Sequence, residues 1–216
     1  MEFRCQALLF DLDGVLVDSR SVIERILRRW AQRHQMDAEA ILSVAHGRRT
    51  IDTVRELAPH LDVDAEVAGL EAAEIADVDG LVAVPGARVL LVALRNESWT
   101  VVTSCGPVLA RRRLTAVDLP VPRLLVTGDD VAHGKPAPDC YRLGAERLGQ
   151  APAACLAFED APAGIAAARG AGARVVALTT THPAHQLAEA DAVVPDFTSV
   201  TVRAIGTGFA VTIGAA

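Results

Sequence analysis

Acidic side chains and a hydroxyl follow several apolar runs of the chain, where they could act together on one ligand. Each run is predicted to be a buried strand, and in an open parallel α/β sheet ligands bind beyond the carboxyl ends of the strands. We therefore expect these side chains to meet at one edge of the sheet. They are Asp11, Asp13, Thr103, Glu159 and Asp160.

Taken one at a time, these positions have ordinary structural interpretations. Asp13 with Gly14 could form a turn. Thr103, Ser104 or Asp160 could each cap a helix. Together they are harder to explain, because like charges about 4 Å apart repel by about 4 kcal/mol at an effective dielectric constant of about 20. Four carboxylates at one site require a cation, and oxygen ligands without histidine or cysteine favour Mg²⁺ bound with a substrate phosphate.

A single lysine, Lys135, stands among the 21 basic residues of the chain, and all the others are arginines. It lies in a Gly-Lys-Pro segment that precedes a predicted helix. A compact ammonium suits a position beside a carboxylate and a phosphate better than a broad guanidinium does. We therefore place Lys135 in the predicted site rather than on the surface.

Two kinds of pattern predict the elements that must position these residues. Residues 3–10 form an apolar run, and after Pro85 strand and helix patterns alternate, which implies a parallel sheet covered by helices. Between these parts, helical periodicity predicts an all-helical insertion over residues 18–82. We therefore expect an α/β core domain formed by residues 1–17 and 83–216, and a separate helical domain between them.

The individual elements follow from the same patterns. Within the insertion, helices are predicted from Ser19 onward and over 38–44, 50–58 and 64–76. After it, the predicted strands are 100–103, 124–126, 155–158, 174–178 and 192–194, and the predicted helices are 107–117, 139–148, 161–171 and 183–189. Alternating apolar residues after Gly206 predict a closing β-hairpin, which could cover a sheet edge or pair with another subunit.

Composition excludes several classes of protein. The net charge is −6 and only 4% of residues are aromatic, so nucleic acid is not an expected partner. No apolar run reaches the roughly 18 to 20 residues that span a bilayer, and the chain starts with a strand-like run rather than a signal peptide. Four cysteines without paired spacing favour reduced thiols, and we expect a cytoplasmic protein without a membrane partner.

Four segments of the chain resemble, in order, the signatures of the haloacid dehalogenase-like (HAD) phosphohydrolase superfamily. The resemblance covers essentially the whole chain and implies the HAD fold, a Rossmann-like parallel sheet with a helical C1-type cap that closes over the site. The segments are Asp11–Ser19, Val101–Ser104, Gly134–Asp139 and Phe158–Gly164.

The resemblance also implies catalytic roles at the matching positions. Asp11 would be the nucleophile that forms an aspartyl-phosphate, and Asp13 would protonate the leaving alcohol and then activate water. Thr103 and Ser104 would contact the transferring phosphoryl group. Lys135 would steady both the nucleophile and the phosphate charge.

A metal site and a phosphate cradle are implied in the same way. Asp160 and Asp11 would bind Mg²⁺ with the main-chain carbonyl of Asp13, and Glu159 would act through a coordinated water. Gly14 would let main-chain amides approach the phosphate closely.

The insertion contains one segment, His46-Gly47-Arg48-Arg49, that resembles the substrate loop of sugar- and polyol-phosphate phosphatases. We expect Arg49 to contact the substrate, with His46 beside it, although both arginines could simply be solvated at a helix start. The run of arginines at 111–113 is interpreted as a solvated helix face without a function. Cys105 is interpreted as an unreactive thiol near the site.

The function expected from these observations is a Mg²⁺-dependent phosphatase for glycerol phosphate or for deoxysugar or hexose phosphates. A sugar-phosphate mutase similar to β-phosphoglucomutase is the main alternative, and a non-catalytic phosphate-sensing module is a further one. The acid at Asp13 disfavours a dehalogenase, and the lack of lysine in residues 18–82 disfavours a phosphonate hydrolase. The expected partner is a small phosphorylated molecule, and the expected state is a monomer or weak dimer.

Overall fold

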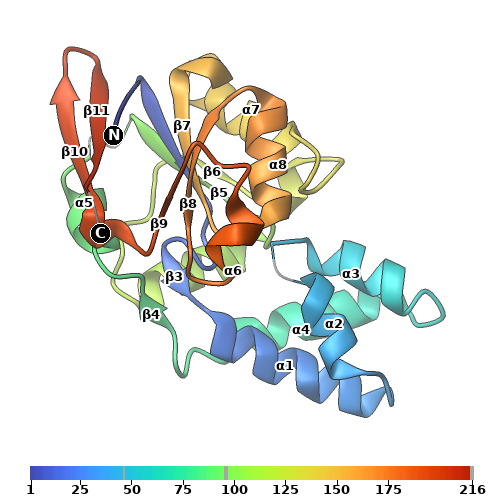
Figure 1. The fold of residues 1–216 in the computed structure, drawn as a ribbon. Coiled ribbons are helices and arrows are strands. Elements are labelled where there is room, and N and C mark those ends of the chain that lie inside the picture. The colour runs from blue at the N-terminus through green and yellow to red at the C-terminus, as the bar shows by residue number, and fades with distance from the viewer. Residues whose placement is uncertain (46, 95–96, 215–216) are drawn as a thin grey trace.

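A six-stranded parallel sheet lies at the centre of the computed structural model, which describes residues 1–45, 47–94 and 97–214 (Figure 1). The strand order is β6-β5-β2-β7-β8-β9, and every neighbouring pair is parallel. The predicted parallel α/β sheet is therefore confirmed. Its strands are β2 (Ala7–Phe10), β5 (Trp99–Val102), β6 (Leu125–Val126), β7 (Cys155–Glu159), β8 (Arg174–Leu178) and β9 (Ala192–Val194).

Helices cover both faces of this sheet. Along β2, Leu8 and Phe10 belong to one buried apolar cluster, and Ala7 and Leu9 belong to another on the opposite face. Burial on both faces explains why the strands are continuous apolar runs rather than alternating ones. The first face packs against α5 (Ala87–Val92) and α6 (Pro107–Ala116), and the second against α7 (Asp139–Arg147) and α8 (Pro162–Ala171).

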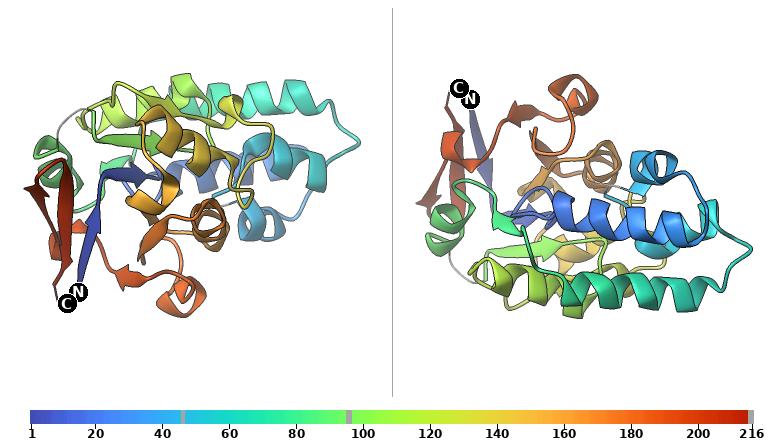
Figure 2. Two further views of the ribbon diagram at one scale, coloured as in Figure 1. Left: turned by 90° about the horizontal axis from the view of Figure 1, so that it is seen from above. Right: turned by 90° about the horizontal axis from the view of Figure 1, so that it is seen from below.

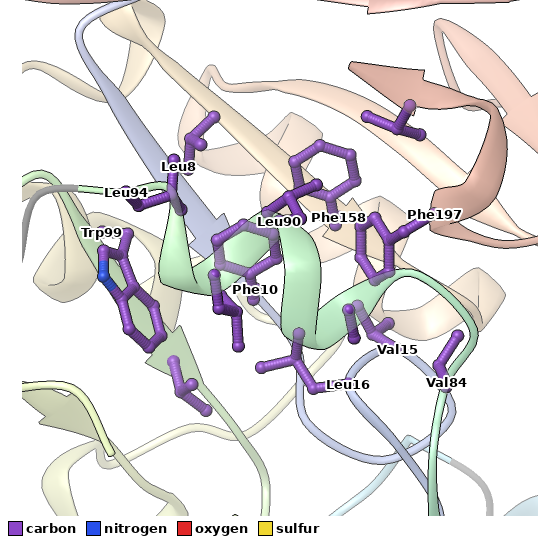
Figure 3. Close-up of a cluster of buried hydrophobic side chains, with 14 of the residues drawn as sticks. Leu8, Phe10, Val15, Leu16, Val84, Leu90, Leu94, Trp99, Phe158 and Phe197 are labelled. Carbon is purple, nitrogen blue, oxygen red and sulfur yellow. The ribbon is translucent and has the colours of Figure 1, made fainter. Parts of the chain in front are cut away.

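An aromatic cluster packs directly behind the strand ends that lead into the predicted site (Figure 3). Phe10 at the end of β2 stacks on Phe158 of β7, with ring centroids 5.0 Å apart. Phe197 and Trp99 meet these rings edge-on. Such pairs contribute about 0.5–1.5 kcal/mol each beyond their buried area. The residues that follow Phe10 and Phe158 are therefore attached to tightly packed strand ends.

The N-terminal run differs from the prediction of a single strand over residues 3–10, which is wrong. The extended segment is interrupted at Gln6, whose amide donates to the carbonyl of Ala154. Residues before the break form β1 (Glu2–Cys5), which pairs antiparallel with β11 (Gly208–Ile213), itself paired with β10 (Val200–Ile205). The predicted C-terminal hairpin is thus confirmed. Because β1 pairs with this hairpin, the first half of the apolar run belongs to a second, three-stranded sheet.

Four helices between the first two strands of the core pack into their own apolar cluster, and we call them the helical block. They are α1 (Arg20–Arg33), α2 (Ala38–Ala45), α3 (Thr50–Leu57) and α4 (Val63–Ala76). A two-stranded ribbon, β3 (Val17–Asp18) with β4 (Val82–Ala83), joins the helical block to the core. Figure 1 shows the block lying beyond the carboxyl ends of the central strands, and Figure 2 shows its longest helices running alongside one another.

Several loops contain short 3₁₀ helices, and one of these replaces a predicted α-helix. The expected helix over residues 183–189 is only a 3₁₀ turn, because Leu187 is its single buried residue and no apolar stripe supports an α-helix. No helix within the described ranges is long and apolar enough to cross a membrane. The 3₁₀ helices are η1 (Gly128–Asp130), η2 (Pro152–Ala154), η3 (Ala184–Leu187) and η4 (Phe197–Ser199).

Candidate active site

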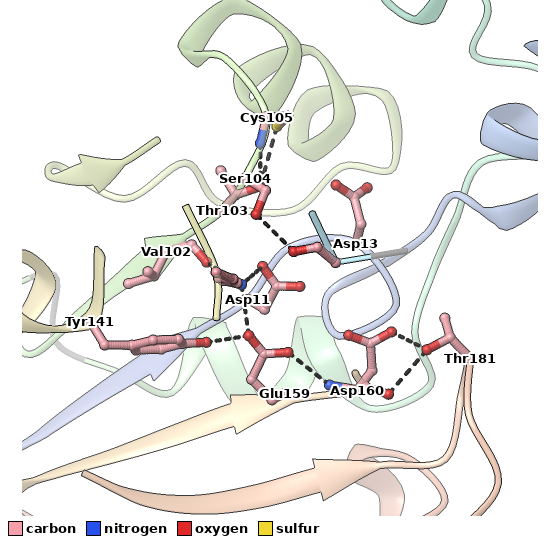
Figure 4. A network of polar contacts seen from close by, with 12 residues as sticks. Asp11, Asp13, Val102, Thr103, Ser104, Cys105, Tyr141, Glu159, Asp160 and Thr181 are labelled. Atoms are coloured by element: carbon pink, nitrogen blue, oxygen red, sulfur yellow. Dashed lines mark hydrogen bonds and ion pairs between the residues drawn. The ribbon is translucent and has the colours of Figure 1, made fainter. Parts of the chain in front are cut away.

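Three neighbouring strands deliver the predicted acids and hydroxyl to one place (Figure 4). Asp11 follows β2, and Thr103 follows β5. Glu159 is the last residue of β7, and Asp160 comes directly after it. Because β5, β2 and β7 are adjacent and parallel, their carboxyl ends lie at the same sheet edge. All four of these side chains are buried. The structure therefore brings together four of the five residues that strand-end reasoning selected, and Asp13 is the exception.

Lys135 lies at the centre of this group. Its ammonium is 2.7 Å from Oδ1 of Asp11, 2.7 Å from Oε1 of Glu159 and 3.3 Å from the carbonyl oxygen of Val102. These three acceptors use its three protons, and the side chain is only 1% exposed. Burial by itself lowers the pKa of Lys135, but the Asp11 and Glu159 carboxylates outweigh burial and raise the pKa. The lysine is therefore a fixed positive charge.

Tyr141 was missed by sequence reasoning and belongs to the same network. It is the only tyrosine of the chain, and its hydroxyl donates to Oε1 of Glu159 at 2.6 Å. Burial raises its pKa well above the ordinary value, so it remains a donor. Its rarity was an available signal, since the same argument selected Lys135.

Three carboxylates form a candidate metal site beside Lys135. Oxygens of Asp11, Glu159 and Asp160 lie within 4.8 Å of one another. Burial raises the pKa of Asp11 to about 7 against the opposing effect of Lys135, and burial with the neighbouring Glu159 and Asp11 raises that of Asp160. One ammonium cannot balance three carboxylates, so ionisation of all three requires further positive charge at the site.

The hydrogen bonds of Asp160 test whether a cation fits this site. Its Oδ2 accepts from the hydroxyl of Thr181, whereas its Oδ1 is buried without a hydrogen-bond partner among the described residues. A buried oxygen with no donor is costly unless a cation or water satisfies it. In contrast, Glu159 already accepts from Lys135 and Tyr141 at Oε1 and from the Asp160 amide at Oε2. The donor set fits a hard divalent cation, with Asp160 offering the freest oxygen.

Asp13 lies apart from the carboxylate cluster, and its side chain points to other partners. Its Oδ1 accepts from the hydroxyl of Ser19 at 2.6 Å, and its Oδ2 accepts from Nη1 of Arg113 at 2.5 Å. A second nitrogen of Arg113 binds Glu74 of α4. Both oxygens of Asp13 are therefore held by side chains from outside the loop that carries it.

The burial of Arg113 corrects the interpretation of residues 111–113 as a solvated face. Arg111 and Arg112 are exposed, but Arg113 is 2% exposed. It falls on the buried stripe of α6 with Leu109 and Leu114, at helical spacing. The signal was present in the sequence, because the apolar positions of this helix place residue 113 on the inner face.

Two glycines are required by the carboxylates beside them. Gly14 has φ +80°, and a Cβ there would lie 2.1 Å from Oδ2 of Asp160. Its own amide donates to the carbonyl of Val17 at 2.8 Å, so that amide is already used inside the loop rather than free for a phosphate. A Cβ on Gly164, in the first turns of α8, would lie 2.0 Å from the carboxylate of Glu159.

We expect Gly164→Ala to lower kcat/KM by about 10- to 100-fold, the usual effect of disturbing a residue that orients a metal ligand. The added methyl group must displace the Glu159 carboxylate from Lys135 and Tyr141. Gly170→Ala is the matched control on the same helix, because its Cβ would meet only Pro138 at 3.5 Å, an ordinary contact. Equal kcat/KM values for the two variants would contradict the assignment of Glu159.

The predicted substrate loop is brought to the core, but not as expected. Arg49 binds Asp52 at 2.7 Å and the carbonyl of Val131 at 3.1 Å, so its guanidinium rests on a core loop and does not line the site cavity. Arg48 does line that cavity. His46 lies outside the described residues.

Two residues that follow β5 connect the site to its surroundings. Ser104 donates to the carbonyl of Gly47 at 2.9 Å, which ties the sheet edge to the helical block. Burial raises the pKa of the Cys105 thiol to about 12, which disfavours its reactive thiolate form.

A cavity opens between the core and the helical block. Asp11, Asp13, Thr103 and Asp160 line its core side. The wall opposite consists largely of apolar side chains of the helical block: Ile23, Leu27, Trp30, Val54 and Leu70. The cavity therefore combines acidic and hydroxyl groups on one side with apolar side chains on the other.

Comparison with known families settles the class of this fold. The model of the family described as haloacid dehalogenase-like hydrolase matches residues 5–172. The chain belongs to this family. It is 40% identical to hexitol phosphatase A of Escherichia coli (strain K12), over 92% of the chain and 94% of that protein. It is 35% identical to glycerol-1-phosphate phosphohydrolase 2 of Saccharomyces cerevisiae, over 94% and 86%.

Solved structures support the same assignment. A hydrolase from Pseudomonas syringae has a TM-score of 0.78 at 28% identity, covering 88% of this chain and 93% of its own. A β-phosphoglucomutase from Clostridium difficile has a TM-score of 0.78 at 18% identity, covering 89% and 91%, and shows the shared fold alone. Membership of this family, together with similarity to named phosphatases, identifies the chain as a phosphatase.

Proposed function

We propose that the chain is a Mg²⁺-dependent phosphatase for small phosphorylated polyols or sugars, and that it works through an aspartyl-phosphate on Asp11. One observation carries the proposal: the Asp11 carboxylate is bound by Lys135 at 2.7 Å and lies beside the unsatisfied oxygen of Asp160, on the floor of the cavity. Bound Mg²⁺ would be held by Asp11, Asp160 and the main-chain carbonyl of Asp13, and it would neutralise phosphate charge.

The residues of the chain can carry out two transfers in sequence. Lys135 binds Oδ1 of Asp11, so we assign the attack on phosphorus to Oδ2. The bond between phosphorus and the leaving oxygen breaks, and Asp13 gives its proton to that oxygen. Asp13 then takes a proton from water as the water attacks phosphorus, which releases inorganic phosphate and restores Asp11. Thr103 holds the phosphoryl oxygens throughout.

The helical block supplies the other half of the cavity, and we propose that it is a cap, residues 18–82, on a core of residues 1–17 and 83–216. The Ser104–Gly47 and Arg49–Val131 hydrogen bonds hold it against the sheet edge. A closed cap excludes water other than the attacking molecule during transfer. We assign the substrate contact of the loop to Arg48, because Arg48 lines the cavity and Arg49 does not.

The substrate class rests on the cavity and on the relatives. Hexitol phosphatase A, the glycerol-1-phosphate phosphohydrolases and 2-deoxyglucose-6-phosphate phosphatase 1 are all similar over more than 90% of the chain. The substrates in their names are phosphate esters of polyols or of a sugar. The apolar wall formed by residues such as Ile23 and Trp30 suits the carbon skeleton of such an ester, and Arg48 and Thr53 offer polar contacts.

Phosphate release from a panel of hexitol, glycerol, deoxysugar, hexose and nucleoside monophosphates tests the proposal, with Mg²⁺ or with a chelator. We expect Mg²⁺-dependent release that is fastest for a polyol or sugar ester. If inorganic phosphate did not accumulate and the phosphoryl group instead returned to the sugar through a bisphosphate, the result would identify a mutase rather than a phosphatase. Mg²⁺ binding without turnover of any ester would favour a sensing module.

Metal binding has a separate test that does not depend on turnover. We expect Mg²⁺ at about 100 times its Kd to raise the melting temperature by roughly 5 to 10 °C, because a ligand of the folded state adds about 2.7 kcal/mol at that excess. Asp160→Asn should abolish the rise. It should not destabilise the metal-free protein, because burial disfavours the ionised form of Asp160. Asp64→Asn, at an exposed position of α4, is the control that keeps the rise.

A further inference from the structure

One buried arginine connects the candidate acid Asp13 to the helical block. Arg113 projects from α6 of the core, where its side chain is 3% exposed. Its Nη1 donates to Oδ2 of Asp13 at 2.5 Å, and its Nη2 donates to Oε2 of Glu74. Glu74 is a buried residue of α4, which packs against α6. Three separate segments therefore meet at one guanidinium.

Pairing with Glu74 alone does not account for this arrangement. Arg113 is buried by the two helices, and Glu74 by itself would neutralise its charge. The guanidinium also binds Asp13, a site carboxylate that Lys135 does not bind. Its planar fork fixes the direction of each hydrogen bond as well as the distance, which the freely rotating ammonium of a lysine does not.

The orientation of Asp13 matters because each of its proton transfers requires a particular oxygen. Arg113 occupies Oδ2, so the proton passed to the leaving group must be carried by Oδ1, whose other partner is the Ser19 hydroxyl. Proton transfer needs hydrogen-bond geometry, and an error of about 1 Å can lower the rate about 100-fold.

We propose that Arg113 is a positioning residue for the proton transfers of Asp13, and that Glu74 makes this positioning depend on the docking of the helical block. The proposal rests on the phosphatase function proposed above. Arg113 does not contact the phosphoryl group in this assignment. It acts through Asp13, so its loss should impair steps that need a proton and spare steps that do not.

Two substrates separate these steps. The leaving alcohol of an alkyl phosphate needs a proton, whereas the nitrophenolate of p-nitrophenyl phosphate leaves without one. The ratio kcat/KM reports the step in which Asp11 attacks and the leaving group departs. We expect Arg113→Met to lower kcat/KM for the best alkyl phosphate of the panel by about 100- to 1000-fold, within the usual contribution of acid catalysis. For p-nitrophenyl phosphate the loss should stay below about tenfold.

Further variants refine the expectation. Arg113→Lys should recover part of the alkyl phosphate rate, since an ammonium keeps the positive charge but lacks the planar fork that fixes the orientation of Asp13. Glu74→Gln should lower the alkyl rate in the same direction but less. Arg111→Met is the matched control, an exposed arginine of the same helix, and it should leave both rates unchanged.

A control for loss of folding is needed, because Arg113→Met leaves the Glu74 carboxylate buried without its arginine partner. The double variant Arg113→Met/Glu74→Leu removes both charges and replaces them with apolar side chains of similar size, which is often neutral for stability. We expect its melting temperature to return to near the native value while the selective loss with alkyl phosphates persists. In an Asp13→Asn background, Arg113→Met should add little further loss, because both changes remove one function.

Three outcomes decide the matter. An equal loss on the alkyl and aryl esters in the folded double variant would overturn the proposal and leave Arg113 a structural residue. An Arg113→Met effect that simply multiplies with that of Asp13→Asn would also overturn it. If the native protein hydrolysed neither ester, the phosphatase function itself would fail, which is distinguishable because the variants would then have no rate to compare.

Discussion

Asp11→Asn is expected to lower kcat by about 10⁴- to 10⁶-fold, the scale on which removal of a covalent nucleophile acts. The amide keeps the shape of the side chain but cannot form the acyl phosphate. Lys135 retains Glu159 as a partner, so the fold should survive the change. Phosphate release from the best ester, measured alongside Asp64→Asn as a control for handling and purity, gives the rate.

A covalent readout makes the same test independent of slow contaminants. Native protein mixed with radiolabelled ester and quenched in acid within one turnover should carry label on the chain, whereas Asp11→Asn should carry none. Mass spectrometry should confirm that asparagine is still present at position 11 after the assay. Retention of more than about 1% of the native rate, or of labelled protein, would show that another residue attacks phosphorus.

Lys135→Met is expected to have the second largest effect, a loss of at least about 1000-fold in kcat together with a destabilisation of about 3–5 kcal/mol. The change leaves Asp11 and Glu159 facing each other without the ammonium that lies 2.7 Å from both. The free energy of unfolding, measured by denaturant titration, and kcat on the same preparation check the two parts. Added Mg²⁺ should restore some stability, since it supplies charge to the same carboxylates.

A second variant at this position tests shape as well as charge. Lys135→Arg keeps the positive charge but must fit a guanidinium into a position that is 1% exposed and bounded by the Val102 carbonyl. We expect it to recover less than about a tenth of the native rate. Arg142→Met, at an exposed position of α7, is the control and should change neither stability nor rate. Full activity of Lys135→Arg would mean that charge alone suffices.

The sequence by itself determined which side chains stand at the ends of the strands. Apolar runs that stop at Asp11, Thr103 and Glu159 predict parallel strands whose carboxyl ends coincide, and the structure places them together. Strands that are buried on both faces appear in the sequence as continuous apolar runs, so local composition was enough to locate them. The lone lysine was selected by its rarity, and it does lie at the centre of the acids.

Only the tertiary structure decided how pairs of side chains from distant segments face each other. The burial of Arg113 against Asp13 and Glu74 depends on how α4 packs on α6. The division of residues 3–10 depends on the hairpin formed some 200 residues later. Arg49 rests on the carbonyl of Val131, although the loop pattern suggested a substrate contact. Each outcome is a long-range competition for partners, which periodicity along the chain does not encode because it reports only which face of an element is apolar.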